Sequence, residues 1–265
     1  MRATFNLRKA GLLAATATVL FTACKKDTTG NNPEPTPPVQ TKLKKISQGE
    51  DVLEFVYGNN GLQAIKTNAD QAAGGQLATF NISYTPDYSK ITELKTTGNQ
   101  RIVPNYGTYG ELASANIYDD KNYLVLATRY AYTGMAIGAI TSSTNGMDLL
   151  KTTFEYGADE NVRKATNWML NPTSGKLEVS GYTAYEYDGK MNPVYVHKTL
   201  LYLLLQNTPR YNVTKETDYD ENNQVSEIRE YSYQYNNQNL PQSATVKTTV
   251  PGGGSTTANV VYSYQ

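Results

Sequence analysis

The chain reads Tyr219-Asp220-Glu221-Asn222-Asn223-Gln224-Val225 and, shortly after, Tyr231-Ser232-Tyr233-Gln234-Tyr235, and this stretch decides the fold. In its second part tyrosines alternate with polar residues, and a period of two is typical of a half-buried β-strand. In its first part acidic residues and asparagines separate Tyr219 from an aliphatic residue, and such residues favour tight turns. A strand that ends in Tyr, a polar turn and a strand that restarts on an aliphatic residue together predict an antiparallel hairpin.

The same unit recurs along the chain. It is found at Tyr57, Tyr84, Tyr118, Tyr156, Tyr187, Tyr219 and Tyr235. The first six of these tyrosines are 27 to 38 residues apart, which is the length of a hairpin with its return connection. We therefore expect an all-β fold, a large antiparallel meander of about 14–17 strands. So long a meander closes into a barrel or curls strongly.

Composition supports this fold class and one large domain. The chain has 22 tyrosines against 5 phenylalanines and one tryptophan, and Tyr and Thr favour pleated, half-buried surfaces. Residues 42–265 are long enough for a single β domain. The 24 basic and 24 acidic residues are interspersed, which argues against a concentrated basic face for nucleic acid.

The N-terminus has the features of an export signal. Residues 1–23 combine basic residues with a short uncharged stretch, and Cys24, the only cysteine, follows directly. The segment Leu20-Phe21-Thr22-Ala23-Cys24 resembles the lipobox of bacterial lipoproteins, although Phe21 stands where leucine is usual. The resemblance implies that Cys24 becomes a lipidated N-terminus, which anchors the protein to the cell envelope, and we expect it at the outer membrane.

Residues 24–41 follow as a tether. They are polar and contain Pro33, Pro35, Pro37 and Pro38, so they cannot bury an apolar face. We expect them to extend from the lipid anchor to the β domain.

The lipobox, the tether and the Tyr-rich hairpins together resemble a known lipoprotein family, domain of unknown function 4595. The Tyr-Asp turns are also similar to the YD-type repeats of secreted bacterial β-proteins. The family resemblance implies a porin-like antiparallel β fold. It implies no established activity and supplies no catalytic residues.

Two segments depart from the repeat. The run Val194–Leu205 is the most apolar of the chain, and it predicts a strand buried on both faces or a strand followed by a short helical turn. The segment Gly134–Gly146 is rich in small residues and predicts a weak strand or a long loop.

The motifs for catalysis and metal binding lack residues that they require. His197 is the only histidine, so no multi-histidine zinc site can form, and we expect it to be structural. The spacing Asp218, Asp220, Asn222 begins like a calcium loop, but Asn223 replaces the required Gly and Arg229 the final Glu. We therefore predict no catalytic residue, no metal site and no cofactor.

The tyrosine rows are the remaining candidates for binding. We name Tyr185, Tyr187, Tyr231, Tyr233 and Tyr235 as the candidate ligand-binding residues. Tyrosine rings stack on sugars and their hydroxyls hydrogen-bond glycans or peptides. The competing interpretation, which we favour, is that these rows pack on the core side of the sheet.

The sequence therefore favours a monomeric envelope lipoprotein that binds or scaffolds without catalysis, with a glycan, peptide or apolar ligand. An extracellular glycan hydrolase is an alternative, and it would require converging carboxylates. An integral outer-membrane barrel is another, and it would require an outward apolar band. Glu227, Arg229 and Gln234 are assigned to the polar second face of their strand, which argues for a wall exposed to water.

Overall fold

The computed structural model describes residues 41–68, 78–204 and 208–265. These residues form sixteen β-strands, a 3-10 turn and one short helix. The strands are β1 (Leu43–Gln48), β2 (Asp51–Gly58), β3 (Gly61–Thr67), β4 (Ala78–Tyr84), β5 (Ile91–Thr96), β6 (Arg101–Tyr106), β7 (Leu112–Tyr118), β8 (Leu124–Thr133), β9 (Ala136–Thr144), β10 (Met147–Tyr156), β11 (Val162–Asn171), β12 (Lys176–Met191), β13 (Tyr211–Tyr219), β14 (Val225–Tyr235), β15 (Pro241–Val250) and β16 (Gly254–Tyr264).

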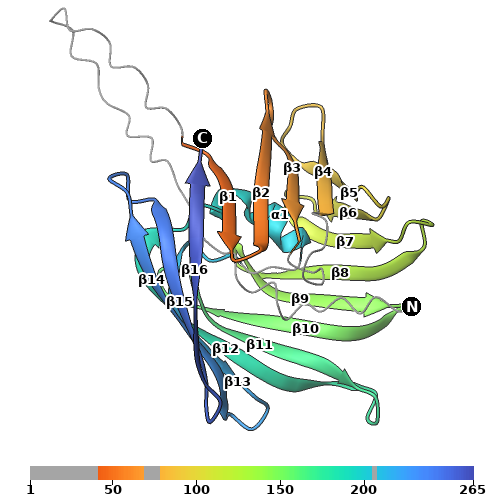
Figure 1. Cartoon of the computed structure of the whole chain (residues 1–265). Helices are drawn as coiled ribbons and strands as arrows, with labels where there is room; N and C mark the ends of the chain where they lie inside the picture. The colour runs from red at the N-terminus through yellow and green to blue at the C-terminus, as the bar shows by residue number, and fades with distance from the viewer. Residues whose placement is uncertain (1–40, 69–77, 205–207) are drawn as a thin grey trace, which may run out of the picture.

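The strands form one closed antiparallel barrel in which each strand pairs with its neighbours in the sequence. The barrel closes where β1 pairs with β16, with Ile46 opposite Tyr262. Figure 1 shows short strands β1 to β7 on one side and longer strands β10 to β16 on the other. The prediction of an all-β, porin-like barrel of about 14–17 strands is confirmed, with sixteen strands.

Side-chain hydrogen bonds explain the repeated Tyr-Asp turns. Asp119 Oδ1 accepts from the backbone N–H groups two and four residues further on, at 3.0 and 2.8 Å. Asp220 and Asn236 make the same pair of bonds in their own turns. Three residues after the Asp, the backbone is left-handed, with φ of 68° at Asn122 and 61° at Asn223. Asparagine adopts this region more readily than most residues, so these turns reverse the chain without strain.

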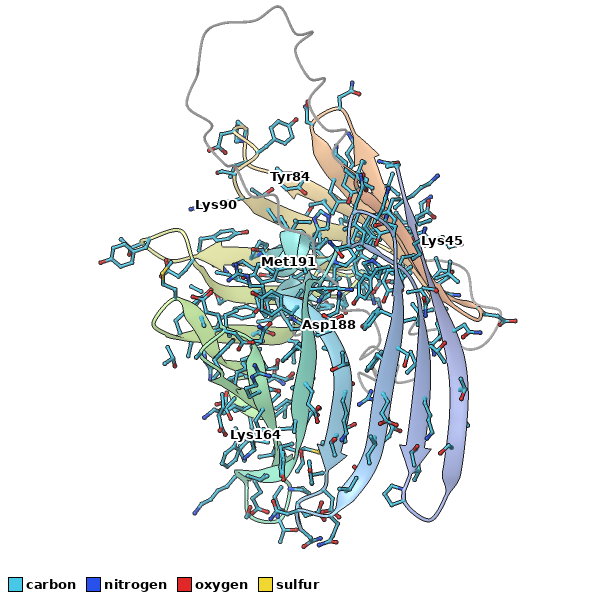
Figure 2. The ribbon with its side chains drawn as sticks, turned by 90° about the vertical axis from the view of Figure 1, so that its left-hand side faces the viewer. Lys45, Tyr84, Lys90, Lys164, Asp188 and Met191 are labelled. Carbon is cyan, nitrogen blue, oxygen red and sulfur yellow. The ribbon has the colours of Figure 1, made fainter. Side chains whose placement is uncertain are left out.

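A helical segment between β12 and β13 packs inside the barrel. A 3-10 turn (Tyr195–His197) leads into the helix α1 (Lys198–Leu203), and Leu200, Leu201 and Leu203 are almost completely buried in the barrel core. We call residues 192–204 the plug. Figure 1 shows α1 behind β1 to β3, and in Figure 2 the side chains crowd around it near Met191.

The plug corrects the prediction for Val194–Leu205. The described part of this run contains no strand, because its apolar residues cover the barrel interior as a helix instead of pairing with a neighbour. The segment Gly134–Gly146 does contain a strand, β9, which lies between the turns at its two ends.

The inner face also differs from expectation at two residues. Glu227 and Arg229 lie four and two positions before Tyr231, so all three share one face of β14. Arg229 lies opposite Glu216 in the β13–β14 register and is mostly buried, with 14% of its side chain exposed. The placement of Glu227 and Arg229 on the outer face was therefore wrong, and of the three only Gln234 faces outward.

Candidate functional site

A ring of tyrosines surrounds one end of the barrel. Every even-numbered strand carries one at or near its last residue, and in an antiparallel barrel these residues meet at the same end. We call this set the tyrosine ring: Tyr57, Tyr84, Tyr106, Tyr132, Tyr156, Tyr187, Tyr235 and Tyr264.

Hydrogen bonds link successive members of the ring. Tyr84 lies opposite Ile91 at the start of β5, and the hydroxyl of the next ring member, Tyr106, donates to the Ile91 carbonyl at 3.0 Å. The same arrangement recurs at four further positions. The bonds run from Tyr132 to Leu112, from Tyr156 to Ile137, from Tyr187 to Val162 and from Tyr264 to Pro241. Each bond ties the end of an even-numbered strand to the start of the odd-numbered strand before it.

Burial keeps these phenols neutral. It raises the pKa of Tyr57 and of Tyr156 to about 12, so both remain hydrogen-bond donors across the physiological pH range. Tyr57 bonds the plug instead of a strand carbonyl, with its hydroxyl 3.0 Å from His197 Nε2.

His197 is enclosed by aromatic side chains. Its ring stacks on Phe55 with 5.2 Å between ring centroids and an interplanar angle of 23°. Burial lowers the pKa of His197 to about 4, so the imidazole is neutral at physiological pH. With a tyrosine hydroxyl as its hydrogen-bond partner, His197 holds the plug in place, as a structural histidine would.

The candidate binding tyrosines lie on the inner face of β12 and β14. The rings of Tyr185 and Tyr187 stack 6.5 Å apart, and those of Tyr231 and Tyr233 stack 6.3 Å apart. Tyr235 continues the second row, and its hydroxyl bonds Asp188 and Asn212. Because these rings face inward and are half-buried, a ligand could reach them only from inside the barrel. Their role in binding stays a prediction.

Further along β13 and β14 the inner face becomes charged. Arg229 contacts three carboxylates: Glu216 at 3.1 Å, Asp218 at 2.5 Å and Glu227 at 3.2 Å. Thr183 donates to Asp218 at 2.6 Å. We call Arg229 and its three carboxylates the charged inner wall, which carries two more carboxyl groups than cations.

Burial dominates the chemistry of Glu216. It raises the pKa of this carboxyl to about 7, although Arg229 acts in the opposite direction. Asp218 and Glu227 are more accessible, with 28% and 35% of their side chains exposed. A carboxyl that protonates near neutrality beside accessible carboxylates is one arrangement that acid–base chemistry uses.

The segment after Asp218, whose spacing begins like that of a calcium loop, is a hairpin turn in the structure. Asp220 Oδ1 accepts hydrogen bonds from backbone N–H groups of its own turn. Asp218 faces inward to Arg229. Within residues 41–68, 78–204 and 208–265, no three His, Cys, Asp or Glu side chains are grouped so that they could hold a metal ion.

Sequence reasoning missed the charged inner wall, although alternation could have found it. Glu216 and Asp218 precede the turn at Tyr219 by odd distances, and Glu227 and Arg229 follow the turn with the same spacing of two. Folding this hairpin places the two pairs opposite each other.

The predicted export and anchoring residues lie outside the described part of the chain. Residues 1–23, Cys24 and nearly all of the tether 24–41 fall there, so lipidation of Cys24 stays a prediction. Among the described residues, no helix has the length and apolar character needed to cross a membrane.

Comparison with known proteins supports the fold. No family description and no curated protein matches the chain. Two of the solved structures that are similar to it are described as porin-like proteins. The one from Bacteroides uniformis is 13% identical with a TM-score of 0.55, covering 85% of this chain and 95% of its own. The one from Bacteroides vulgatus is 12% identical with a TM-score of 0.55, covering 85% and 99%.

At these identities the likeness shows the fold alone. The porin-like antiparallel barrel that the sequence resemblance implied is therefore confirmed. Membership of the domain-of-unknown-function family stays a prediction.

Proposed function

We propose that this protein is a lipid-anchored barrel of the cell envelope whose wall faces water and which binds a ligand without transforming it. The supporting observation is a ladder of opposite charges on the outer face of β12 to β15. Glu186 lies opposite Lys215, Lys215 opposite Glu230, and Glu230 opposite Lys247.

The ladder argues against insertion in a bilayer. Its side chains are between about a third and two thirds exposed, and they lie near the middle of their strands. A lysine on the lipid face costs about 2–4 kcal/mol at the bilayer midplane. In water such a ladder is an ordinary solvated surface, so the lipidated Cys24 would hold the barrel at the membrane and not within it.

The plug argues against a channel. Leu200, Leu201 and Leu203 fill the core at the tyrosine-ring end, and the Tyr130 hydroxyl donates to the Tyr202 carbonyl at 2.9 Å. Binding is then the function that an occluded, water-facing barrel with an aromatic inner surface supports best.

The test combines membrane attachment with conductance. The wild-type protein should fractionate with membranes, and the Cys24→Ala protein should be released into the soluble fraction. Purified without detergent, the Cys24→Ala protein should be monodisperse and rich in β-structure. Neither form should produce current in planar bilayers. A stable conductance, or a Cys24→Ala protein that needs detergent to stay dispersed, would overturn the proposal in favour of the integral barrel.

The charged inner wall favours one second candidate, a glycan hydrolase. Glu216, with its pKa near neutrality, would act as the acid, and Asp218 or Glu227 as the second carboxylate. Purified protein would then release reducing ends from an oligosaccharide, and Glu216→Gln would abolish the release. Turnover that survives Glu216→Gln, or no turnover at all, would dismiss this candidate.

A further inference from the structure

The tyrosine ring is interrupted at Tyr84. By the rule of the ring, Tyr84 on β4 would bond the strand-start residue of β3, and this is Leu62, which lies opposite Tyr57 as Ile91 lies opposite Tyr84. No such bond forms. Among the described residues, Tyr84 is the ring member whose hydroxyl has no hydrogen-bond partner.

Strand pairing is interrupted at the same place. The ladder between β3 and β4 runs from Thr67 opposite Ala78 to Ala64 opposite Asn81 and stops there. The remaining residues of both strands diverge, and a cleft of about 380 Å³ opens between them. Figure 2 shows Tyr84 at this rim of the barrel, near Lys90. A cleft of this size falls within the range of small-molecule sites.

The lining of the cleft is aromatic, apolar and uncharged. Leu62 and Ile82 contribute apolar surface, and the rings of Tyr84 and Tyr88 lie 5.9 Å apart at an angle of 37°. The amide side chains of Asn60 and Gln63 add polar groups, and the residues that line the cleft are together Asn60, Leu62, Gln63, Ile82, Tyr84, Thr85, Pro86 and Tyr88.

Tyr88 is held over the cleft in an unusual backbone conformation. Its φ is 57°, at the turn position where Asn122 and Asn223 stand in other hairpins. A bulky residue is rare in this region. The Asn60 amide donates to the Tyr88 hydroxyl at 2.8 Å, which joins the tips of the two hairpins and fixes the exposed ring. The turn would form more easily with asparagine, so the ring at this position is a feature of the surface and not a need of the fold.

We propose that this cleft binds a ring of a neutral saccharide. Aromatic faces accept the apolar face of a sugar, and amides together with the free Tyr84 hydroxyl satisfy its hydroxyl groups. None of the described residues that line the cleft is charged, which disfavours phosphate, sulfate or a polyamine as the ligand. The proposal rests on the binding role proposed above and gives it a site and a ligand class.

The experiment titrates the purified protein with maltose, cellobiose and lactose, and with glucuronic acid as a charged probe, by calorimetry and saturation-transfer NMR. At least one neutral disaccharide should bind and glucuronic acid should not. Tyr84→Phe, which removes only the hydroxyl, should weaken binding about fivefold. Tyr88→Asn should weaken it at least tenfold while leaving the thermal midpoint equal to or above that of the wild type, since asparagine suits the left-handed turn.

Tyr109→Asn is the matched control, because Tyr109 is a turn tyrosine that is 95% exposed and lies outside the cleft. It should bind as the wild type does. No binding of any neutral probe, or equal losses in Tyr88→Asn and Tyr109→Asn, would overturn the saccharide site. Such a failure is distinct from failure of the proposed function, which depends on membrane attachment and conductance.

Discussion

The tyrosine-ring end of the barrel and the charged inner wall are built from the same alternating strands, yet the first buries apolar and neutral side chains and the second buries charged ones. At the ring end, apolar plug residues and neutral phenols fill the interior, and six of the eight ring hydroxyls bond backbone carbonyls or His197. At the charged wall, Arg229 is surrounded by three carboxylates, one of which is almost fully buried.

The two regions are therefore expected to contribute differently to the free energy of unfolding. Buried apolar side chains contribute about 1.5–3 kcal/mol each. Buried charges are a net gain only when every partner is in place, since desolvation offsets much of their attraction. The plug is therefore expected to carry the stability of the barrel, and the charged wall to make that stability depend on pH.

The largest effect is expected in the plug. Leu201→Asp replaces a side chain that is 1% exposed with a carboxyl group that has no partner. It should lower the free energy of unfolding by about 5 kcal/mol or more, from lost packing and from desolvation. The control is Val196→Asp, a residue of the same segment that is 62% exposed, which should change stability by less than about 0.5 kcal/mol. Urea unfolding measures both, and equal losses would show that the plug is not part of the folded core.

Removing the cation of the charged inner wall should have the next largest effect. Arg229→Met leaves three carboxylates facing one another, and breaking a buried ion pair from one side costs about 3 kcal/mol or more. The loss should be greater at pH 8, where Glu216 of the wild type is ionised beside Arg229, and should shrink toward pH 5 as the buried Glu216 takes up a proton. The double variant Arg229→Met, Glu216→Gln should recover part of it. A loss that does not vary with pH would contradict the electrostatic account.

Most of the barrel could be read from the sequence because its signals are local. The alternation around Tyr231, Tyr233 and Tyr235 and the Asp or Asn at each turn are set within one hairpin, so the strand number followed. The helix of the plug could not be read this way. Its apolar run has no partner strand, and only the closed barrel makes the interior that it fills.

The candidate sites were less predictable than the fold. Glu216 and Arg229 come together through one hairpin, so their pairing was within reach of the alternation. The cleft at Tyr84 depends on where the β3–β4 ladder stops, and no local pattern marks that point. Tyr88, a tyrosine at a turn position where Asn122 and Asn223 stand in other hairpins, was the local sign of it.

His197 should give the ring end its own, weaker pH dependence. Its pKa is about 4 in the folded protein and about 6.5 when the chain unfolds, so the unfolded state takes up a proton first as the pH falls. The contribution of His197 is therefore complete above pH 6.5 and declines on acidification, by about 2 kcal/mol at pH 5. Among the described residues, no charged side chain forms an ion pair with His197. The polar contact of its imidazole ring is the Tyr57 hydroxyl.

The measurement for His197 is urea unfolding at pH 7.5 and pH 5. The wild type should lose about 2 kcal/mol more between these values than His197→Gln does, because the variant has no titrating ring. Parallel pH profiles would mean that the imidazole is not buried in the folded protein.

The smallest effect should come from single hydroxyls of the tyrosine ring, where a member with a hydrogen bond can be compared with the member that has no partner among the described residues. Tyr106→Phe removes the bond to the Ile91 carbonyl and should lower the free energy of unfolding by about 1 kcal/mol. Tyr84→Phe removes a hydroxyl that has no partner among the described residues and should change it by less than about 0.3 kcal/mol. Thermal unfolding of both variants under one buffer condition resolves this difference. If Tyr84→Phe lost as much as Tyr106→Phe, the ring would be continuous in solution and the cleft between β3 and β4 would be closed.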